Sequence, residues 1–390
     1  MGAKLSGQVS DRRRPMRPHT SARPPRPVWP GGERYGTHRV LEPKGVLPQP
    51  ALRLDNDFNR IFGGEVLLAV TTLNIDAASF AQIEEEARLQ PQPSHPPSTA
   101  PTGEEALDDA VAHIVVRTVT ARGKQHNPVT GSGGMLVGRV LQVAPGREGE
   151  SPRVGDRVAT LASLTLTPLR IDRVSAVRRA TGQLDVEGEA VVFASAPYAK
   201  LPDDITERLA LAVLDVAGAA SQVERLVRPG RVVVVLGAGG KSGVLSVAQA
   251  RLSGGPSAHI IGVESRPQAA DELLALGLCS EVVVADARDP IAIREAVVRS
   301  SGGREADVTF SCVNVQDAEL SAVLATRERG VVYFFAMSTS FTKAALGAEG
   351  AGKDVDLFIG NGYAVGHADR TLALLRETPA LRALFERRYG

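Results

Sequence analysis

The residues with the clearest chemical potential form a glycine-rich stretch, RVVVVLGAGGKSG, at residues 231–243. An unbroken apolar run of this kind is typical of a buried strand, and the glycines after it permit a tight turn and the close approach of a pyrophosphate to the main chain. Phosphates then meet free N–H groups at the start of the following helix. The pattern predicts a cofactor-binding turn, although a glycine-rich turn without a ligand also fits it. Its residues are Gly237, Gly239, Gly240, Lys241, Ser242 and Gly243.

An acidic residue follows the second predicted strand. Residues 259–263 form a short apolar run, and Glu264 comes 21 residues after Gly243. A carboxylate at this position accepts hydrogen bonds from a ribose diol and repels a 2′-phosphate, so Glu264 favours NAD over NADP. Arg266 weakens that preference. We therefore expect NAD as the cofactor.

Further apolar runs continue the pattern towards the C-terminus, at residues 281–285, 307–311 and 331–336. Helical or polar segments separate them. Strands that alternate with helices at this spacing predict an α/β fold with a doubly wound parallel sheet.

Composition excludes several functional classes. The chain has 390 residues, room for two domains, and a formal net charge of +1, so charge points to neither nucleic acid nor a membrane surface. No apolar run approaches the ~20 residues of a membrane-spanning helix. The two cysteines, Cys279 and Cys312, cannot form a disulfide framework or a four-cysteine zinc site, and are expected to be small buried hydrophobes of a cytoplasmic protein.

The first half of the chain divides by composition. Residues 1–33 are rich in Arg and Pro and are expected to be disordered, as residues 90–103 are expected to form a flexible loop. Apolar residues at helical spacing predict an amphipathic helix over residues 104–122. Short strands with glycine turns predict a β-rich domain over residues 34–200, before the cofactor domain at 201–390.

A β-rich domain followed by a Rossmann domain resembles the medium-chain dehydrogenase/reductase superfamily, with its GroES-like substrate domain. The resemblance covers most of residues 60–340. Longer segments resemble the L-erythro-3,5-diaminohexanoate dehydrogenase family of lysine fermentation: YGTHRVLEPKGVLPQP, LNIDAASF, RGKQHNPVTGSGGMLVG, SLTLTPLRID and VVVLGAGGKSG. This resemblance implies NAD-dependent oxidative deamination of the diamino acid to 5-amino-3-oxohexanoate and ammonia. Resemblance to the superfamily, whose members commonly pair through Rossmann edge strands, also implies a homodimer.

The zinc-dependent branch of the superfamily offers a second comparison. Asp76 falls where that branch has its first catalytic-zinc cysteine, Gly134 where it has a histidine, and Asp215 where it has its last cysteine. Two carboxylates and a glycine suit zinc poorly, because zinc prefers thiolate and imidazole ligands. The resemblance therefore implies a site without metal.

Oxidation of an amine requires its neutral form, so a substrate ammonium must lose a proton in the site. Asp76 and Asp215 are the candidate catalytic residues: one takes the C3 proton while the other holds the C5 ammonium. The sequence does not assign which does which. Either aspartate also fits a structural role, as a helix cap or turn residue.

Three polar residues within the recognised segments are candidates for binding the substrate carboxylate: His38, His126 and Arg170. Arginine suits this role best because its guanidinium group forms two parallel hydrogen bonds with a carboxylate. Each also fits a surface or structural role.

Two other functions remain open. A zinc-free, NADPH-dependent quinone or enoyl reductase shares the architecture, but Glu264 and the two aspartates argue against it. A non-enzymatic protein that senses the redox state of the cofactor would bind nicotinamide without turning over an amine.

Overall fold

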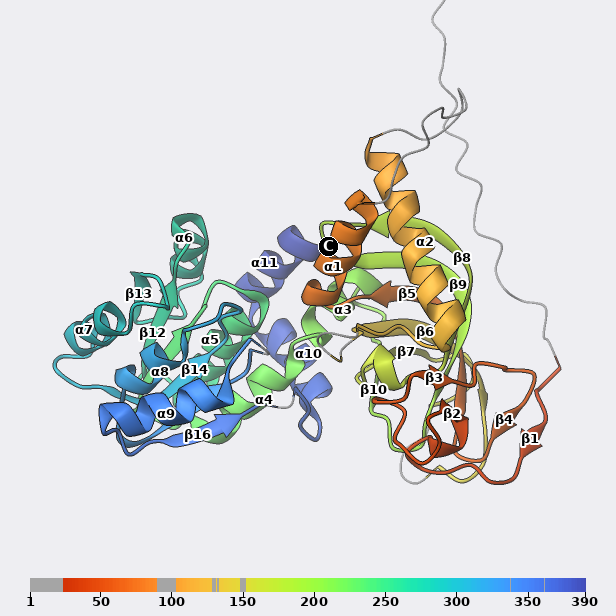
Figure 1. Ribbon diagram of the computed structural model, residues 1–390. Coiled ribbons are helices and arrows are strands. Elements are labelled where there is room, and N and C mark those ends of the chain that lie inside the picture. Colours follow the sequence, from red (N-terminus) through yellow and green to blue (C-terminus); the bar gives the residue numbers. More distant parts are fainter. Residues whose placement is uncertain are drawn as a thin grey trace, which may run out of the picture.

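The computed structural model describes residues 24–89, 103–127, 131, 133–147, 152–336, 338–360 and 362–390. Two lobes stand side by side, each built on one six-stranded sheet (Figure 1). The first 23 residues lie outside the described residues, and so does the predicted loop at 90–103 except for its last residue. Within the described part, no helix is long and apolar enough to cross a membrane.

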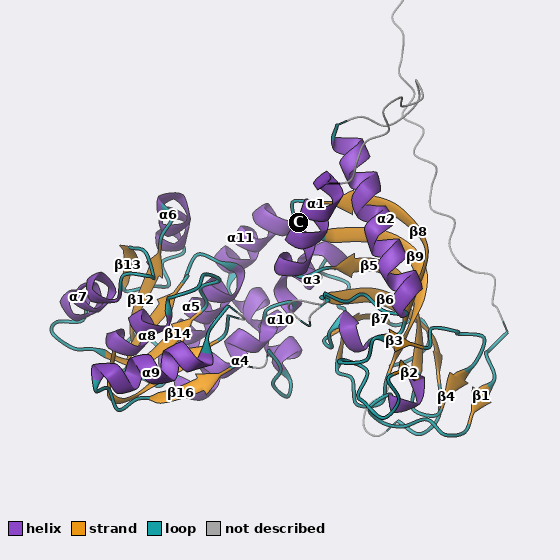
Figure 2. Cartoon of the chain, viewed as in Figure 1, coloured by secondary structure: helices purple, strands orange, loops and turns teal. Residues whose placement is uncertain are grey.

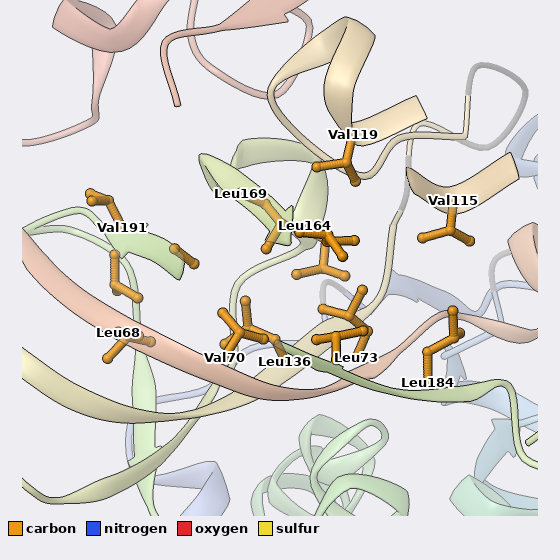
Figure 3. Packing of buried hydrophobic residues seen from close by; sticks show 14 of the residues in the cluster. Leu68, Val70, Leu73, Val115, Val119, Leu136, Leu164, Leu169, Leu184 and Val191 are labelled. Carbon is orange, nitrogen blue, oxygen red and sulfur yellow. The ribbon is translucent and has the colours of Figure 1, made fainter. Parts of the chain in front are cut away.

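The N-terminal lobe is an antiparallel sheet in the order β10-β7-β6-β5-β9-β8. Helices α1 (Ala77–Leu89) and α2 (Glu104–Arg122) pack against it, and α2 has the predicted bounds. Figure 3 shows Leu68, Val70 and Leu73 of β5 in the core that also contains Val115 and Val119 of α2. Each such buried side chain contributes roughly 1.5–3 kcal/mol. The strands are β5 (Val66–Asn74), β6 (Met135–Val143), β7 (Arg157–Thr160), β8 (Leu169–Arg178), β9 (Gln183–Val192) and β10 (Tyr198–Lys200).

The segment before this sheet is more ordered than its composition predicts. The expected disorder does not extend over residues 24–33, because β1 (Val28–Trp29) pairs in parallel with β4 (Ile61–Phe62). Arg26 donates to the Phe58 carbonyl at 2.7 Å and to Glu189 at 2.8 Å. An arginine of this Arg-rich segment is thus held by the buried carboxylate of Glu189, which lies far away in the sequence.

Residues 34–62 wrap the lobe around one buried ion pair. They include the short helix Thr37–Arg39 and the strands β2 (Val40–Glu42) and β3 (Arg53–Leu54). The Arg39 and Glu65 side chains are both fully buried, and Arg39 Nε and Nη2 each donate to a Glu65 oxygen at 2.8 Å. Because a buried charge requires a partner, this pair ties the wrapped segment to the start of β5.

The C-terminal lobe confirms the predicted parallel sheet, in the order β13-β12-β11-β14-β15-β16. Alternate residues of β11 face opposite helical layers: Val233 and Val235 lie with α4, α5 and α6, and Val234 lies with α7, α8 and α9. Figure 2 shows these helices on both sides of the sheet. The strands are β11 (Val232–Leu236), β12 (His259–Glu264), β13 (Glu281–Val284), β14 (Ala306–Ser311), β15 (Thr326–Phe334) and β16 (Asp356–Ile359).

The last helix joins the lobes. Leu381, Leu384 and Phe385 of α11 are buried against α3 and α10, and Figure 1 shows the C-terminus beside α1. The helices of this lobe are α3 (Glu207–Leu214), α4 (Ala217–Leu226), α5 (Lys241–Gly254), α6 (Pro267–Ala275), α7 (Pro290–Ser300), α8 (Glu319–Ala325), α9 (Phe341–Ala351), α10 (His367–Glu377) and α11 (Pro379–Tyr389).

Both cysteines are free thiols. Burial raises the pKa of Cys279 to about 12 and that of Cys312 to about 11. They remain protonated at neutral pH, as expected of small apolar side chains.

Candidate active site

The glycine turn lies where the strand order of the parallel sheet reverses, because the chain runs outward from β11 through β12 and returns to β14 on its other side. Ligands of such sheets bind at the carboxyl ends of the strands at this point. Gly237 has φ +72°, a left-handed conformation that favours glycine. Helix α5 begins at Lys241, and no described side chain caps its N-terminus at Gly240. The first N–H groups of α5 are therefore available to an anion.

The other glycines of the turn differ in the space around them. A Cβ atom added to Gly243 would lie 2.1 Å from the Gly237 carbonyl oxygen, so only glycine lets α5 pack this closely on the turn. A Cβ on Gly240 would lie 3.4 Å from the same oxygen, an ordinary contact. Gly243 is thus required by the fold itself, whereas Gly240 leaves open space in front of the turn.

We expect Gly243→Ala to destabilise the protein by about 1–3 kcal/mol, the usual cost of overpacking. Gly240→Leu is expected to leave the melting temperature near that of the wild type and to weaken NADH binding at least tenfold, because its side chain fills the space in front of the turn. Thermal unfolding and fluorescence titration with NADH measure the two effects. Equal melting temperatures for wild type and Gly243→Ala would contradict this view of the turn.

Glu264 ends β12 and is 5% exposed. Its Oε2 accepts a hydrogen bond from the Gly239 N–H at 3.1 Å, and its Oε1 accepts from the backbone and side chain of Arg266. A Cβ on Gly239 would lie 2.6 Å from Oε2. The carboxylate thus stands directly against the glycine turn.

A cavity of about 290 Å³ opens between the lobes, next to the start of α5. Its volume is at the lower end of the range for small-molecule sites. A larger cavity of about 540 Å³ also lies between the lobes, but no residue of the glycine turn lines it. We therefore assign the candidate site to the smaller cavity. Its walls include Asn74, Phe80, Arg179 and Gln183 from the N-terminal lobe, with Lys241 and Tyr389 from the other.

Asp215 belongs to this site through Lys241. It follows the last residue of α3, and its Oδ2 accepts a hydrogen bond from Lys241 Nζ at 2.7 Å. The ammonium also lies 5.8 Å from the centre of the Tyr389 ring. Burial lowers the pKa of Lys241, but the Asp215 carboxylate more than offsets this and the net pKa is raised. This lysine of the predicted cofactor turn is thus held as a cation beside the cavity.

Asp76 caps a helix. It immediately precedes α1, and its two carboxylate oxygens accept hydrogen bonds from the Ser79 N–H at 2.9 Å and the Ser79 hydroxyl at 2.6 Å. Asn127 in turn donates to the Ser79 hydroxyl oxygen. The neighbours of Asp76, Ile75 and Ala77, line the cavity. The aspartate stands near the site, but its described contacts are those of an N-cap residue.

The structure places none of the three predicted carboxylate-binding residues in the cavity wall. His38 Nδ1 accepts from the Glu33 N–H at 3.0 Å, and Nε2 donates to Glu65 at 2.8 Å, so both ring nitrogens are occupied. Arg170 is held by Asp172 and Glu189. Protein groups occupy the polar atoms of His38 and Arg170, so the structure brings neither residue into the wall of the candidate site. Their contact with the substrate carboxylate stays a prediction.

His126 is partly buried near Lys124. Burial, with smaller contributions from Lys124 and Arg122, lowers its pKa to about 4, and its Nδ1 has no hydrogen-bond partner among the described residues. A neutral imidazole cannot pair with a carboxylate as a cation. His126 also lies outside the cavity wall, and its contact with the substrate carboxylate stays a prediction.

The sequence predictions did not include Asn74, Gln183 or Tyr389. Gln183 donates to Asn74 Oδ1 at 3.2 Å, and both side chains are buried at the cavity wall. Tyr389 ends a helix whose apolar spacing is readable in the sequence. No local sequence pattern predicts its contact with Lys241, which lies 148 residues earlier in the chain.

The described residues contain no cluster of three or more His, Cys, Asp or Glu side chains that could hold a metal ion. Gly134 has φ +90°, and a Cβ there would lie 2.0 Å from the Asn74 carbonyl oxygen. No side chain fits at that position without movement of the backbone.

Comparison with known proteins identifies close relatives. The family model for the L-erythro-3,5-diaminohexanoate dehydrogenase N-terminal domain matches residues 38–94 and 99–202. Two proteins named L-erythro-3,5-diaminohexanoate dehydrogenase, from Acetoanaerobium sticklandii and Fusobacterium nucleatum, are 46% and 45% identical to this chain. Each alignment covers 92% of this chain and 99% of the relative.

Solved structures with the same fold are more distant in sequence. The CurK enoyl reductase is 15% identical, with a TM-score of 0.51 over 81% of this chain and 79% of its own. A mycobacterial protein solved in complex with NADPH is 16% identical, with a TM-score of 0.50 over 83% and 81%. These likenesses support the two-domain dehydrogenase/reductase fold.

Proposed function

Because this chain belongs to the L-erythro-3,5-diaminohexanoate dehydrogenase family, we propose that it catalyses the NAD-dependent oxidative deamination of L-erythro-3,5-diaminohexanoate to 5-amino-3-oxohexanoate and ammonia. The chain is an oxidoreductase by its family. The observation that carries the finer assignment is an aspartate, Asp215, beside the glycine turn, in contact with a cavity-lining lysine. A carboxylate there suits a substrate whose ammonium group must lose a proton.

The glycine turn fits a nicotinamide dinucleotide. Its supporting features are the uncapped start of α5, the open space at Gly240 and the position of Glu264 at the end of β12. The N–H groups of α5 would hold the pyrophosphate and Glu264 the adenosine ribose. The bound cofactor supplies the hydride acceptor for C3 of the substrate.

The task of the protein side chains is to manage the proton. We assign the base to Asp215, because Lys241 occupies only its Oδ2, and its Oδ1 accepts no hydrogen bond among the described residues. Asp76 instead spends both oxygens on Ser79. Asp215 accepts the proton from the C3 ammonium before oxidation, and then assists the attack of water on the resulting imine. In balance, the ammonium, NAD⁺ and water give the ketone, ammonium ion, NADH and one proton.

A direct assay tests this function. Purified protein is expected to form NADH with 3,5-diaminohexanoate and not with simple α-amino acids or alcohols, and to keep its activity after prolonged chelation. Reduction of quinones or enoyl thioesters by NADPH serves as the comparison reaction. Absence of turnover with the diamino acid would reject the proposal, and parallel loss of zinc and activity would reject metal independence.

Glu264→Ala is expected to raise the KM for NAD and to narrow the preference for NAD over NADP. The carboxylate repels a 2′-phosphate, and its removal leaves Arg266 to attract one. Steady-state kinetics with both cofactors measure the change. Wild-type protein that uses NADP as readily as NAD would show that Glu264 does not discriminate.

We also propose a homodimer formed through β16. Among the described strands β16 pairs with β15 alone, and its Phe358 and Ile359 side chains are 47% and 61% exposed. An unpaired apolar edge of a sheet is suited to pairing with another strand. Ile359→Lys is expected to give monomers in analytical ultracentrifugation, whereas Val284→Lys on the opposite edge strand leaves the dimer intact. The reverse result would place the interface on β13.

A further inference from the structure

We propose that Lys241 binds the C1 carboxylate of the substrate, and that Tyr389 is the residue that positions it. This inference rests on the proposed function, because it specifies how that substrate is held. A contact between Lys241 and this carboxylate would make the enzyme selective for a β-amino acid over an amine that lacks a carboxylate at the same position.

Only two cationic side chains line the cavity among the described residues, Lys241 and Arg179. Arg179 contacts three carboxylates: Asp108 at 2.7 Å, Glu84 at 3.6 Å and also Glu104. Its charge is thus already compensated several times over. In the part of the chain that the structure describes, Lys241 has one carboxylate partner, Asp215.

Lys241 retains capacity for a second anion. An ammonium has three N–H donors, and one of them binds Asp215. The side chain is 30% exposed, so it remains accessible from the cavity. It is also the first residue of α5, where the helix dipole adds positive potential. Its raised pKa keeps it charged at neutral pH.

The Lys241–Asp215 pair matches the charge pattern of a β-amino acid. In the substrate, one methylene separates the negative carboxylate from the carbon that bears the C3 ammonium. In the site, a cation and an anion stand 2.7 Å apart. With the carboxylate on Lys241, the neighbouring Asp215 meets the C3 ammonium, which is the group from which it takes a proton. Recognition and catalysis then use adjacent side chains.

Tyr389 fixes the lysine from the other side. Its ring lies 5.8 Å from Lys241 Nζ and contacts the Phe385 ring at 5.5 Å between centres. Its neighbour Arg388 donates to the Gly239 carbonyl at 2.8 Å and binds Glu272 of α6. The end of α11 is thus attached to the glycine turn itself, and the cation–π contact restrains the ammonium.

The test compares two substrates in three proteins. Wild type, Lys241→Met and Lys200→Met are assayed with 3,5-diaminohexanoate and with its C1 amide. Lys200 is a matched control, because it pairs with Asp156 at 2.9 Å outside this cavity. Lys241→Met is expected to lower kcat/KM for the acid roughly 10- to 100-fold, the scale of a charge-assisted hydrogen bond. We expect kcat/KM for the amide to change far less. The preference for acid over amide then collapses in this variant alone.

Each other outcome has a distinct meaning. Equal losses on acid and amide would show that Lys241 only supports Asp215, and a matching rise in the Kd for NADH would assign it to the cofactor phosphates; either result overturns the inference. Lack of turnover in the wild type would instead reject the proposed function. Tyr389→Phe is expected to retain the KM for the acid, because the ring remains. Tyr389→Ala is expected to raise this KM several-fold with little change in kcat. An unchanged KM in Tyr389→Ala would remove Tyr389 from the proposal.

Discussion

Asp215→Asn is expected to lower kcat/KM for 3,5-diaminohexanoate by about 10² to 10⁴, the usual contribution of a general base. The amide has the shape of the carboxylate and its oxygen still accepts the hydrogen bond from Lys241. It cannot take up the proton of the C3 ammonium. Kinetics with NAD at saturation measure the loss, and titration with NADH is expected to show nearly unchanged cofactor affinity.

Asp76→Asn is the matched comparison. Asparagine is as good an N-cap as aspartate, and its side-chain oxygen still accepts from the Ser79 N–H, so stability and activity are expected to change little. The sequence alone predicts a loss of activity at both positions. Near-wild-type turnover of Asp215→Asn combined with a large loss at Asp76 would exchange the two roles.

Arg39→Leu is expected to destabilise the protein by about 3–5 kcal/mol, because it leaves the Glu65 carboxylate buried without its main partner. The matched control is Arg60→Leu, which removes an arginine that is 30% exposed and pairs with Asp55 and Asp57. That change is expected to cost less than about 1 kcal/mol. Denaturant unfolding of the variants gives both values. Similar costs at the two positions would show that the buried pair contributes no more than a partly exposed pair.

The same pair makes a prediction about acid. Burial by itself raises the pKa of Glu65, but hydrogen bonds from Arg39, His38 and the Phe62 N–H outweigh it, and the net pKa lies below 4.5. The ionised carboxylate therefore contributes its full stability above about pH 4.5, and that contribution is lost as the pH falls through the lowered pKa. Unfolding free energies measured from neutral pH to pH 3 are expected to fall less steeply in Glu65→Gln than in the wild type.

Much of the C-terminal lobe was readable in the sequence because its signals are local. The strand, turn and helix around Gly237 and the carboxylate at Glu264 occupy about thirty consecutive residues, and their spacing follows from the backbone alone. Helix 104–122 was predicted for the same reason, since apolar residues at helical spacing mark its buried face. Strand β16 was not predicted; Phe358 and Ile359 at its end are 47% and 61% exposed, so they form no clear buried pattern.

His38 and Arg170 lie outside the candidate site for a shared physical reason. Both look available in the sequence, but Glu65 binds His38 from 27 residues away and Glu189 binds Arg170 from 19 residues away. The expected disorder of residues 24–33 failed in the same way, because Arg26 binds Glu189 from 163 residues away. Whether a charged side chain binds another part of the fold or a ligand depends on which groups the tertiary structure places within hydrogen-bond distance of it.

The sequence by itself determined the family, the parallel sheet and the position of the cofactor turn, since each depends on residue types in a continuous stretch. Only the tertiary structure decided the composition of the site. It brought Lys241 onto Asp215 across 26 residues, set Tyr389 against that lysine from the far end of the chain, and committed Asp76 to Ser79. Ion pairs and ring contacts depend on distances in space, and sequence spacing does not encode those distances beyond a few turns of helix or a hairpin.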